Sequence, residues 1–364
     1  MRLFLDYFGM VWRHGFDLRH TPRALVWIAK IGLTEGWREA EMVQRWMSDE
    51  PRTLQHPPLF ILGYYRSGTT HLQEVLMKDS RYGYLDFYHC FFSPAFNLTQ
   101  SWFQPVAQAI ATLFGVIHPA HRIPFQFSLP GEEDVSLLFS ALPEASNWGQ
   151  VFPRQFKQLY GDTALFLDKQ PPTVRRAFLD ALTDLHWRSS KANDHKRMIF
   201  KSPPHTGRLE ALRELYPDAR YIFIRRDPYE VFASNKGLWH SFSLTWFQEI
   251  DADAVQENIL WSHDLAHQNY ERDKVGLAAN QLVEVSFEDF LADPMATMEH
   301  IYCTLELGEF DVHAPAMRAY VDSVHVSEPP QHEISASEEE AVRTRLGRWL
   351  DAWGYSKRLT RGAA

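Results

Sequence analysis

The stretch Gly63-Tyr-Tyr-Arg66-Ser-Gly68-Thr-Thr70 decides the fold, because it places a glycine loop between a strand pattern and a helix pattern. Residues 59–62 form a short apolar run of strand character, and apolar residues recur at helical spacing over residues 72–76. A strand, a glycine turn and a helix in this order bring unpaired backbone amides and the positive end of the helix dipole together. The stretch therefore predicts a binding site for phosphate or sulfate.

The loop differs from that of nucleoside triphosphate-binding proteins at one decisive position. In those proteins a lysine follows the second glycine, and the serine or threonine after it binds magnesium. Thr69 occupies the lysine position here, and the cation within the loop is Arg66, which offers several donors in a fixed fork. The loop thus indicates anion binding without triphosphate chemistry. For the loop alone, a surface turn that contains an arginine is an equal alternative.

A second apolar run, residues 221–224, ends in two arginines and leads into a helix start. Asp227 is suited to the N-cap of that helix, Pro228 to its first position and Glu230 to a capping box. Arg226 then lies at the carboxyl end of a strand, where open α/β sheets bind ligands. Ser234 follows about two turns into the helix, with a hydroxyl for a second phosphate. A solvated arginine pair and a helix-packing serine are the alternatives.

A third run, residues 198–200, ends in Lys201-Ser-Pro-Pro-His205 before a leucine-rich helical pattern. We expect Arg66, Lys201 and Arg226 to meet at one edge of a parallel sheet. The whole chain of 364 residues carries 37 Lys+Arg against 46 Asp+Glu, a formal net charge of −9. A concentrated positive site in an acidic protein favours a specific anionic ligand over nucleic acid.

Together these three motifs resemble the sulfotransferase superfamily, and the resemblance spans residues 58–307. Its donor is 3'-phosphoadenosine 5'-phosphosulfate. The resemblance implies that Arg66, Ser67, Gly68, Thr69 and Thr70 bind the 5'-phosphosulfate. It also implies that Arg226 and Ser234, eight residues apart, bind the 3'-phosphate. Lys201-Ser-Pro203 and the segment 285–294 resemble the family as well.

The resemblance implies a metal-independent in-line attack of an acceptor oxygen or nitrogen on sulfur, with Arg66 and Lys201 stabilising the departing phosphate. Soluble phenol and steroid members carry a histidine base where this chain has Pro203, so the pattern is closer to the bacterial and carbohydrate or lipid branches. Those branches use a carboxylate base. In the cluster Glu132-Glu133-Asp134 we select Glu133 as the base and keep His205 as the reserve. An ordinary acidic helix start is the alternative for this cluster.

A metal site is the competing interpretation for His263 and His267, which lie four residues apart as in zinc proteases. Asp264 replaces the glutamate of that motif and no third ligand stands out, so we expect no metal. Cys90 and Cys303 are the two cysteines, which fits buried thiols in a reducing compartment better than a disulfide framework. We therefore expect a cytoplasmic protein.

The fold class expected from these motifs is α/β: a three-layer, P-loop-like fold with a central parallel sheet flanked by helices. We divide the chain into an N-terminal helical arm and linker (1–56), the α/β domain (57–310) and a C-terminal helical tail or lid (311–364). Within the tail, residues 311–324 and 337–353 are expected to be helical. Gln331-His332-Glu333 falls where related enzymes place a donor-covering loop, and a solvated loop is the alternative.

The N-terminal arm has no cleavage site and is interrupted by Asp6 and Arg13, so we reject a signal peptide and a membrane span. Aromatic and basic residues over 1–46 indicate packing against the core or a second subunit, and a peripheral membrane contact stays open. The aromatic segment 86–194 is interpreted as an acceptor-binding insertion for a lipid, a carbohydrate or a small hydrophobic metabolite. Completion of the core is its alternative.

Three functions remain open from the sequence: a sulfotransferase, a P-loop-type kinase, and a catalytically silent nucleotide- or lipid-binding protein. The kinase is disfavoured because Thr69 replaces the loop lysine. Cations, not acidic magnesium ligands, also follow the other two strands. The resemblance favours the sulfotransferase.

Overall fold

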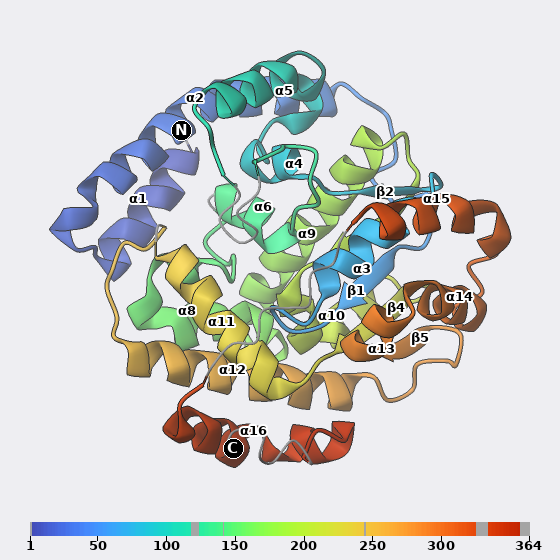
Figure 1. The fold of residues 1–364 in the computed structure, drawn as a ribbon. Coiled ribbons are helices and arrows are strands. Elements are labelled where there is room, and N and C mark those ends of the chain that lie inside the picture. Colours follow the sequence, from blue (N-terminus) through green and yellow to red (C-terminus); the bar gives the residue numbers. More distant parts are fainter. Residues whose placement is uncertain (1, 118–123, 141, 244, 325–333, 357–364) are drawn as a thin grey trace.

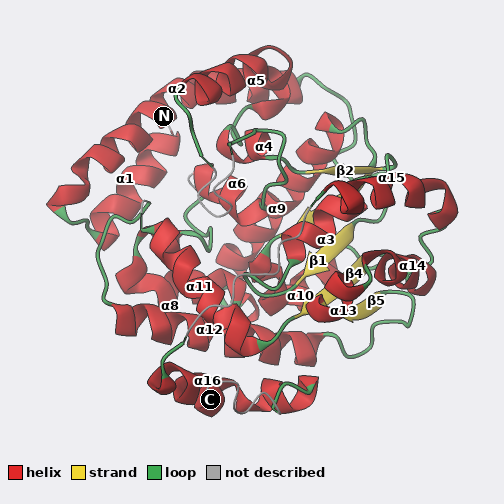
Figure 2. Ribbon diagram, in the orientation of Figure 1, coloured by secondary structure: helices red, strands yellow, loops and turns green. Residues whose placement is uncertain are grey.

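A five-stranded parallel sheet forms the centre of the computed structural model, which describes residues 2–117, 124–140, 142–243, 245–324 and 334–356 (Figure 2). The strands lie in the order β2-β3-β1-β4-β5. Their bounds are β1 Leu59–Leu62, β2 Tyr82–Tyr84, β3 Arg197–Lys201, β4 Arg220–Arg225 and β5 Leu282–Ser286. The predicted α/β class with a central parallel sheet is confirmed.

The first strand lies in the middle of the sheet, with β3 on one side and β4 on the other. All four of its residues are fully buried, as expected for a strand covered on both faces. Phe60 and Leu62 face one hydrophobic cluster, whereas Leu59 and Ile61 face another. This alternation follows from the two-residue period of a strand and explains the unbroken apolar run in the sequence.

Helices cover both faces of the sheet and extend well beyond it (Figure 1). On one face lie α3, α13, α14 and α15, and on the other α9 and α10. The helices are α1 Arg2–His14, α2 Thr21–Trp46, α3 Thr69–Leu76, α4 Phe87–Phe91, α5 Phe96–Leu113, α6 Glu133–Phe139, α7 Trp148–Val151, α8 Phe156–Ala164, α9 Pro172–Ala192, α10 Leu209–Leu215, α11 Pro228–Phe242, α12 Ala252–Asp273, α13 Phe287–Ala292, α14 Pro294–Thr304, α15 Phe310–Ser323 and α16 Ala336–Trp353. A 3₁₀ segment, η4 (Pro203–Arg208), joins β3 to α10. No helix among the described residues combines the length and the apolar character needed to cross a membrane.

The local predictions are confirmed with one correction. The three predicted strands are β1, β3 and β4, and both terminal regions are helical. Asp227 caps α11 through its side chain, which accepts from the backbone N–H of Tyr229 at 2.9 Å. The predicted capping box with Glu230 is wrong, because the backbone N–H of Asp227 donates to Glu288 from another element, at 3.2 Å. Tertiary contact thus replaces the local interaction.

A close contact fixes the glycine at the start of α3. Gly68 has a left-handed backbone with φ of 97° and serves as the N-cap of α3. A Cβ atom at this position would lie 2.2 Å from the ring of Phe287, which follows β5. The loop after β1 therefore needs glycine for two independent reasons, its backbone angle and the approach of an aromatic ring.

Substitution Gly68→Ala is expected to destabilise the protein by about 2 kcal/mol or more, because the left-handed backbone and the ring contact both oppose a side chain. The free energy of unfolding in urea measures this. Gly237→Ala is the matched control, since that glycine lies inside α11 with nothing within 4 Å of the added methyl group. The control should be neutral or up to about 1 kcal/mol stabilising. Equal stability of the two variants would contradict the packing argument.

Candidate active site

The loop after β1 is held in place by contacts from both neighbouring strands. The backbone N–H of Gly63 donates to Oγ1 of Thr206, in the segment after β3, at 2.8 Å. The carbonyl of Tyr65 accepts from the side-chain amide of Asn235 in α11 at 2.9 Å. Ser67 donates its hydroxyl to the carbonyl of Tyr64 at 2.7 Å. These contacts position the loop, while the first turn of α3, with Thr69 and Thr70, offers amides that a helix leaves without internal acceptors.

The structure brings Arg66 into direct contact with both Arg226 and Ser234. The Nε atom of Arg66 donates to Oγ of Ser234 at 2.9 Å. The Nη1 atom of Arg226 donates to the backbone carbonyl of Arg66 at 3.0 Å. The guanidinium of Arg226 also lies over the ring of Phe287, 4.6 Å from its centroid. Three residues separated by up to 168 positions in the chain thus form one cationic corner.

The two guanidinium groups make this corner suited to an anion. Burial lowers the pKa of Arg66, and the neighbouring positive charge of Arg226 lowers it further. Both effects disfavour the charged form of Arg66, and an anion between the two side chains would relieve them. Arg66 also adopts a left-handed backbone with φ of 70°, which is uncommon for a residue other than glycine. The site therefore concentrates positive charge under backbone strain.

Lys201 is placed at the same edge of the sheet, because its backbone pairs in register with Ile61 of β1. Its side chain is almost fully buried and its Nζ atom donates to Oε1 of Glu132 at 2.6 Å. Glu132 retains partial exposure and immediately precedes α6. Glu133, its neighbour, was the carboxylate predicted from the sequence as the base. In a run of three carboxylates, only the orientation of the following helix determines which one faces the lysine.

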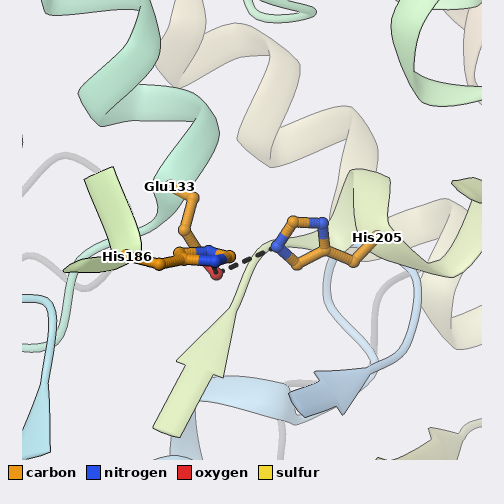
Figure 3. A group of neighbouring side chains, drawn as sticks. All are labelled: Glu133, His186 and His205. Carbon is orange, nitrogen blue, oxygen red and sulfur yellow. Dashed lines mark hydrogen bonds and ion pairs between the residues drawn. The ribbon is translucent and has the colours of Figure 1, made fainter. Parts of the chain in front are cut away.

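The side chains of Glu133 and His205 meet each other in the fully buried interior (Figure 3). His205 Nε2 lies 2.9 Å from Glu133 Oε1, and His186 Nε2 lies 3.6 Å from the same oxygen. Burial alone would raise the pKa of Glu133, but the facing His205 and His186 hold it well below its ordinary value. His186 was not recognised in the sequence, where a lone helical histidine carries no signal.

A buried ion pair extends this group. Arg208 donates to both carboxylate oxygens of Asp134, and Ser202 donates to one of them at 2.7 Å. The Nε and Nη2 atoms of Arg208 also face Nδ1 of His205, at 3.1 and 3.0 Å. The network therefore links α6, which follows Glu132, to the segment that follows Lys201. Breaking a buried pair of this kind leaves an uncompensated charge, so its geometry is strongly held.

Glu133, His186 and His205 are the group of potential metal ligands that the described residues contain. Their geometry fits a hydrogen-bonded chain better than a metal ion. Arg208 can only donate, so Nδ1 of His205 accepts and the proton of the neutral ring lies on Nε2, facing Glu133. A metal would require a free lone pair on that same Nε2 atom. The arrangement therefore disfavours His205 as a ligand.

The histidine pair of the competing zinc interpretation packs among aromatic rings. His267 Nδ1 lies 2.8 Å from the carbonyl of His263, and the His267 ring lies 4.9 Å from that of Trp353. Cys90 is buried as expected, whereas the expectation of burial for Cys303 is wrong, since it is exposed. The segment Gln331-His332-Glu333, compared above with a donor-covering loop, lies outside the described residues.

A parallel sheet whose carboxyl edge collects a glycine loop, two arginines and a lysine–carboxylate pair places this chain among α/β proteins with a site suited to an anion. The model of the sulfotransferase family matches residues 57–311, more than half of the chain. The protein therefore belongs to the sulfotransferase family and is an enzyme of that kind.

Individual relatives agree with this assignment. The chain is 24% identical over 308 residues to omega-hydroxy-beta-dihydromenaquinone-9 sulfotransferase of Mycobacterium bovis, covering 83% of this chain and 76% of the relative. The same values hold for the protein of that name from Mycobacterium tuberculosis. In fold, the chain is similar to sulfotransferase STF1 from Mycobacterium tuberculosis (TM-score 0.69, 18% identity, 95% and 91% of the chains). A second similar structure is sulfotransferase STF9 from Mycobacterium avium (TM-score 0.61, 18% identity, 84% and 78%).

The buried histidines predict a loss of stability as the pH falls. Burial lowers the pKa of His267 to about 4, and it also lowers the pKa values of His186 and His263. Between pH 6.5 and about 4 the unfolded chain therefore binds more protons than the folded one, so the free energy of unfolding decreases with decreasing pH.

For His267→Gln, we expect the slope of unfolding free energy against pH near pH 5 to decrease by about one proton, or about 1.4 kcal/mol per pH unit. Urea titrations between pH 7 and 5 measure it. His240→Gln is the control, because His240 is exposed. An unchanged slope in His267→Gln would show that this side chain becomes protonated in the folded state.

Proposed function

We propose that the protein transfers a sulfuryl group from 3'-phosphoadenosine 5'-phosphosulfate to a hydroxyl group of an apolar acceptor, without a metal ion. The observation that carries the proposal is the Lys201–Glu132 contact of 2.6 Å at the sheet edge that also holds the Arg66 loop. The ammonium group of Lys201 can stabilise the departing phosphate, and the carboxylate of Glu132 can accept the proton of the acceptor. Belonging to the sulfotransferase family supports the reaction class.

For the donor, we assign the 5'-phosphosulfate to the loop of Arg66, Ser67, Gly68, Thr69 and Thr70, and the 3'-phosphate to Arg226 and Ser234. The contact between Arg66 and Ser234 supports this assignment, because it shows that both side chains reach one corner. The ring of Phe287 lies against the guanidinium of Arg226 and helps to hold this group at the corner, where guanidinium groups bind phosphate well.

In the reaction, the acceptor oxygen attacks sulfur while the bond between sulfur and the bridging oxygen breaks. The acceptor proton passes to Glu132, and the electron pair of the broken bond stays on the 5'-phosphate. Lys201 and Arg66 stabilise that added negative charge. Before the donor binds, Lys201 and Glu132 satisfy each other. The donor phosphate draws the ammonium group to itself and leaves the carboxylate free to accept a proton.

We assign the base to Glu132 instead of Glu133. Glu133 is fully buried and bonded to His205, whereas Glu132 is partly exposed next to Lys201. In this scheme, Glu133 and His205 act as positioning residues: with Arg208 and Asp134 they hold the start of α6 against the end of β3. A carboxylate base agrees with the branch that the motifs resemble.

The acceptor is proposed to be a lipid. Phe91 and Phe139 stack at 4.6 Å, and Phe87 and Phe125 lie 5.3 Å apart, in a partly exposed aromatic group on the segments that flank Glu132. Such rings contact isoprenoid or acyl chains well. The menaquinone named for the two mycobacterial relatives is consistent with this class. Other rings expected to line the acceptor site, Trp148 and Phe152, are fully buried in the core.

We propose that the enzyme acts in the bacterial cytoplasm at its boundary with the membrane and has no nucleic-acid partner. Residues 1–46 support a peripheral contact, because exposed Leu5, Phe8 and Trp12 leave an apolar side on α1. Association into a homo-oligomer through the same arm is the second function proposed for this apolar side of α1.

Adenosine 3',5'-bisphosphate is expected to raise the melting temperature in the absence of magnesium, since cations and amides of the protein alone hold the phosphates. At 100 times the dissociation constant the stabilisation should be about 2.7 kcal/mol. Arg226→Ala should weaken the affinity for the bisphosphate at least tenfold, as measured by calorimetric titration. Arg225→Ala, at the neighbouring position, is the matched control. Stabilisation by magnesium–ATP but not by the bisphosphate would refute the donor assignment and favour the kinase.

Glu132→Gln should lower kcat by about 10²–10⁴-fold and remove the acid limb of its pH profile, while bisphosphate affinity changes little. Glu133→Gln is the comparison, and it should lower the melting temperature but keep the acid limb. Single-turnover rates with labelled donor and the acceptor isolated from extract measure both. Loss of the acid limb in Glu133→Gln alone would return the base to Glu133.

A further inference from the structure

The helix α5 has an apolar side that faces solvent. Its 18 residues include no Asp, Glu, Lys or Arg. Trp102, Val106, Ile110 and Leu113 recur at intervals of three or four residues and are all exposed, Leu113 by 80%. The opposite side packs on the protein through the buried Phe96, Thr99, Ala107 and Ala111. A helix with one apolar side buried and another apolar side in water lacks the polar surface expected of a soluble protein.

The neighbouring helix α2 repeats this arrangement. Ala24, Ile31 and Thr34 are buried against the protein, while the exposed positions over residues 22–36 hold only proline, glycine, alanine, leucine and valine. Leu25 and Val26 are more than half exposed. On α1, Leu5, Phe8 and Trp12 are exposed, Trp12 by 92%, and the exposed Arg13 stands beside them.

The three helices lie together at one rim of the molecule (Figure 1). Trp37 of α2 packs on Trp102 and Phe103 of α5, at 5.6 and 4.9 Å between ring centroids. Tyr7 of α1 stacks on Trp27 of α2 at 6.0 Å and donates its hydroxyl to the carbonyl of Ala24. We call the solvent-facing side of α1, α2 and α5 the outer apolar face. It gathers exposed large apolar residues from three adjoining helices, unlike the single apolar residues scattered over any protein surface.

The charge of this part of the chain differs from the rest. Residues 1–46 carry seven Lys and Arg residues and five Asp and Glu residues, hence a net +2, and α5 carries none, although the whole chain is at −9. An apolar face flanked by positive charge complements an anionic lipid surface. Tryptophan at the exposed positions 12, 46 and 102 also suits the boundary between lipid and water.

The outer apolar face is connected to the reaction site through aromatic contacts. Trp27 of α2 packs on Phe139 at 5.2 Å, and Phe139 packs on Phe91 at 4.6 Å. Phe139 ends α6, the helix that begins immediately after Glu132. A lipid that leaves a bilayer at this face would therefore meet aromatic rings on the way to the carboxylate.

We infer that the outer apolar face docks the enzyme on the surface of an anionic lipid bilayer, so that a membrane-resident acceptor reaches Glu132 without crossing water. The inference rests on the proposed transfer to a lipid acceptor. In this arrangement the face lies on the bilayer surface, since none of the described helices is long and apolar enough to cross a membrane.

Flotation with vesicles of phosphatidylglycerol and phosphatidylethanolamine tests the inference. The wild-type protein should float, and the double variant Val106→Glu/Ile110→Glu should reduce the bound fraction at least tenfold. Val275→Glu/Val312→Glu is the matched control, because both residues are at least 70% exposed on other elements. The control should bind vesicles like the wild type. Thermal stabilisation by adenosine 3',5'-bisphosphate should be equal in all three proteins, which shows that the fold and the donor site are intact.

Two results would overturn the docking inference and leave the proposed function standing. One is a wild-type protein that stays in solution with vesicles but is stabilised by the bisphosphate. The other is a dimer, seen by sedimentation velocity, that the double variant dissociates while vesicle binding is absent; the occupant of the face is then a second copy. Loss of bisphosphate binding in the wild type would instead sink the proposed function.

Discussion

Parallel pairing of β1 with β3 on one side and β4 on the other is the constraint on which the site depends. It places the loop of Arg66 between the strand ends that carry Lys201 and Arg226, so cations from three distant segments lie at one edge of the sheet. This arrangement requires close packing at the edge of the sheet. A glycine must stand at position 68, because the ring of Phe287 occupies the space of its side chain. The same ring lies against Arg226, so one aromatic residue contacts both the loop and the cationic corner.

The buried pair of Arg208 and Asp134 determines the other half of the site. Asp134 lies in the first turn of α6 and Arg208 ends the segment that follows Lys201, so their contact brings Glu132 next to the lysine. Isolated buried charges are costly, and this pair is stable because Ser202 and Ser146 donate further hydrogen bonds to the carboxylate. The residues that the sequence suggested for chemistry, Glu133 and His205, belong to this supporting layer in our assignment. Glu133 and His205 have side chains suited to acid–base chemistry, but they contact each other in the interior and do not reach the surface.

The sequence predicted the local structure around Arg66 and Arg226 more completely than that around Glu132, for a physical reason. Strand, turn and helix patterns around Arg66 and Arg226 are local, and parallel pairing then brings them together by a general rule. The capping of α11 shows the limit of local reasoning, because Glu288 from a distant helix takes the bond expected of Glu230. Successive helical residues point in directions about 100° apart, so the orientation of α6 decides whether Glu132 or Glu133 faces Lys201. A run of three carboxylates in the sequence does not reveal that orientation. His186 and Phe287 act through contacts formed only in the folded chain.

The N-terminal arm shows why a pattern of apolar residues can support two interpretations at once. Packing against the core was the favoured interpretation, and α2 indeed buries Ala24 and Ile31. The exposed side of α2 is apolar as well. Because neither side is polar, the spacing of apolar residues along the helix does not distinguish the exposed side from the buried one. A surface of this composition is unfavourable in water. Contact with a bilayer would remove this surface from water. The same helices that complete the core would then hold the reaction site at the bilayer, where the proposed lipid acceptor resides.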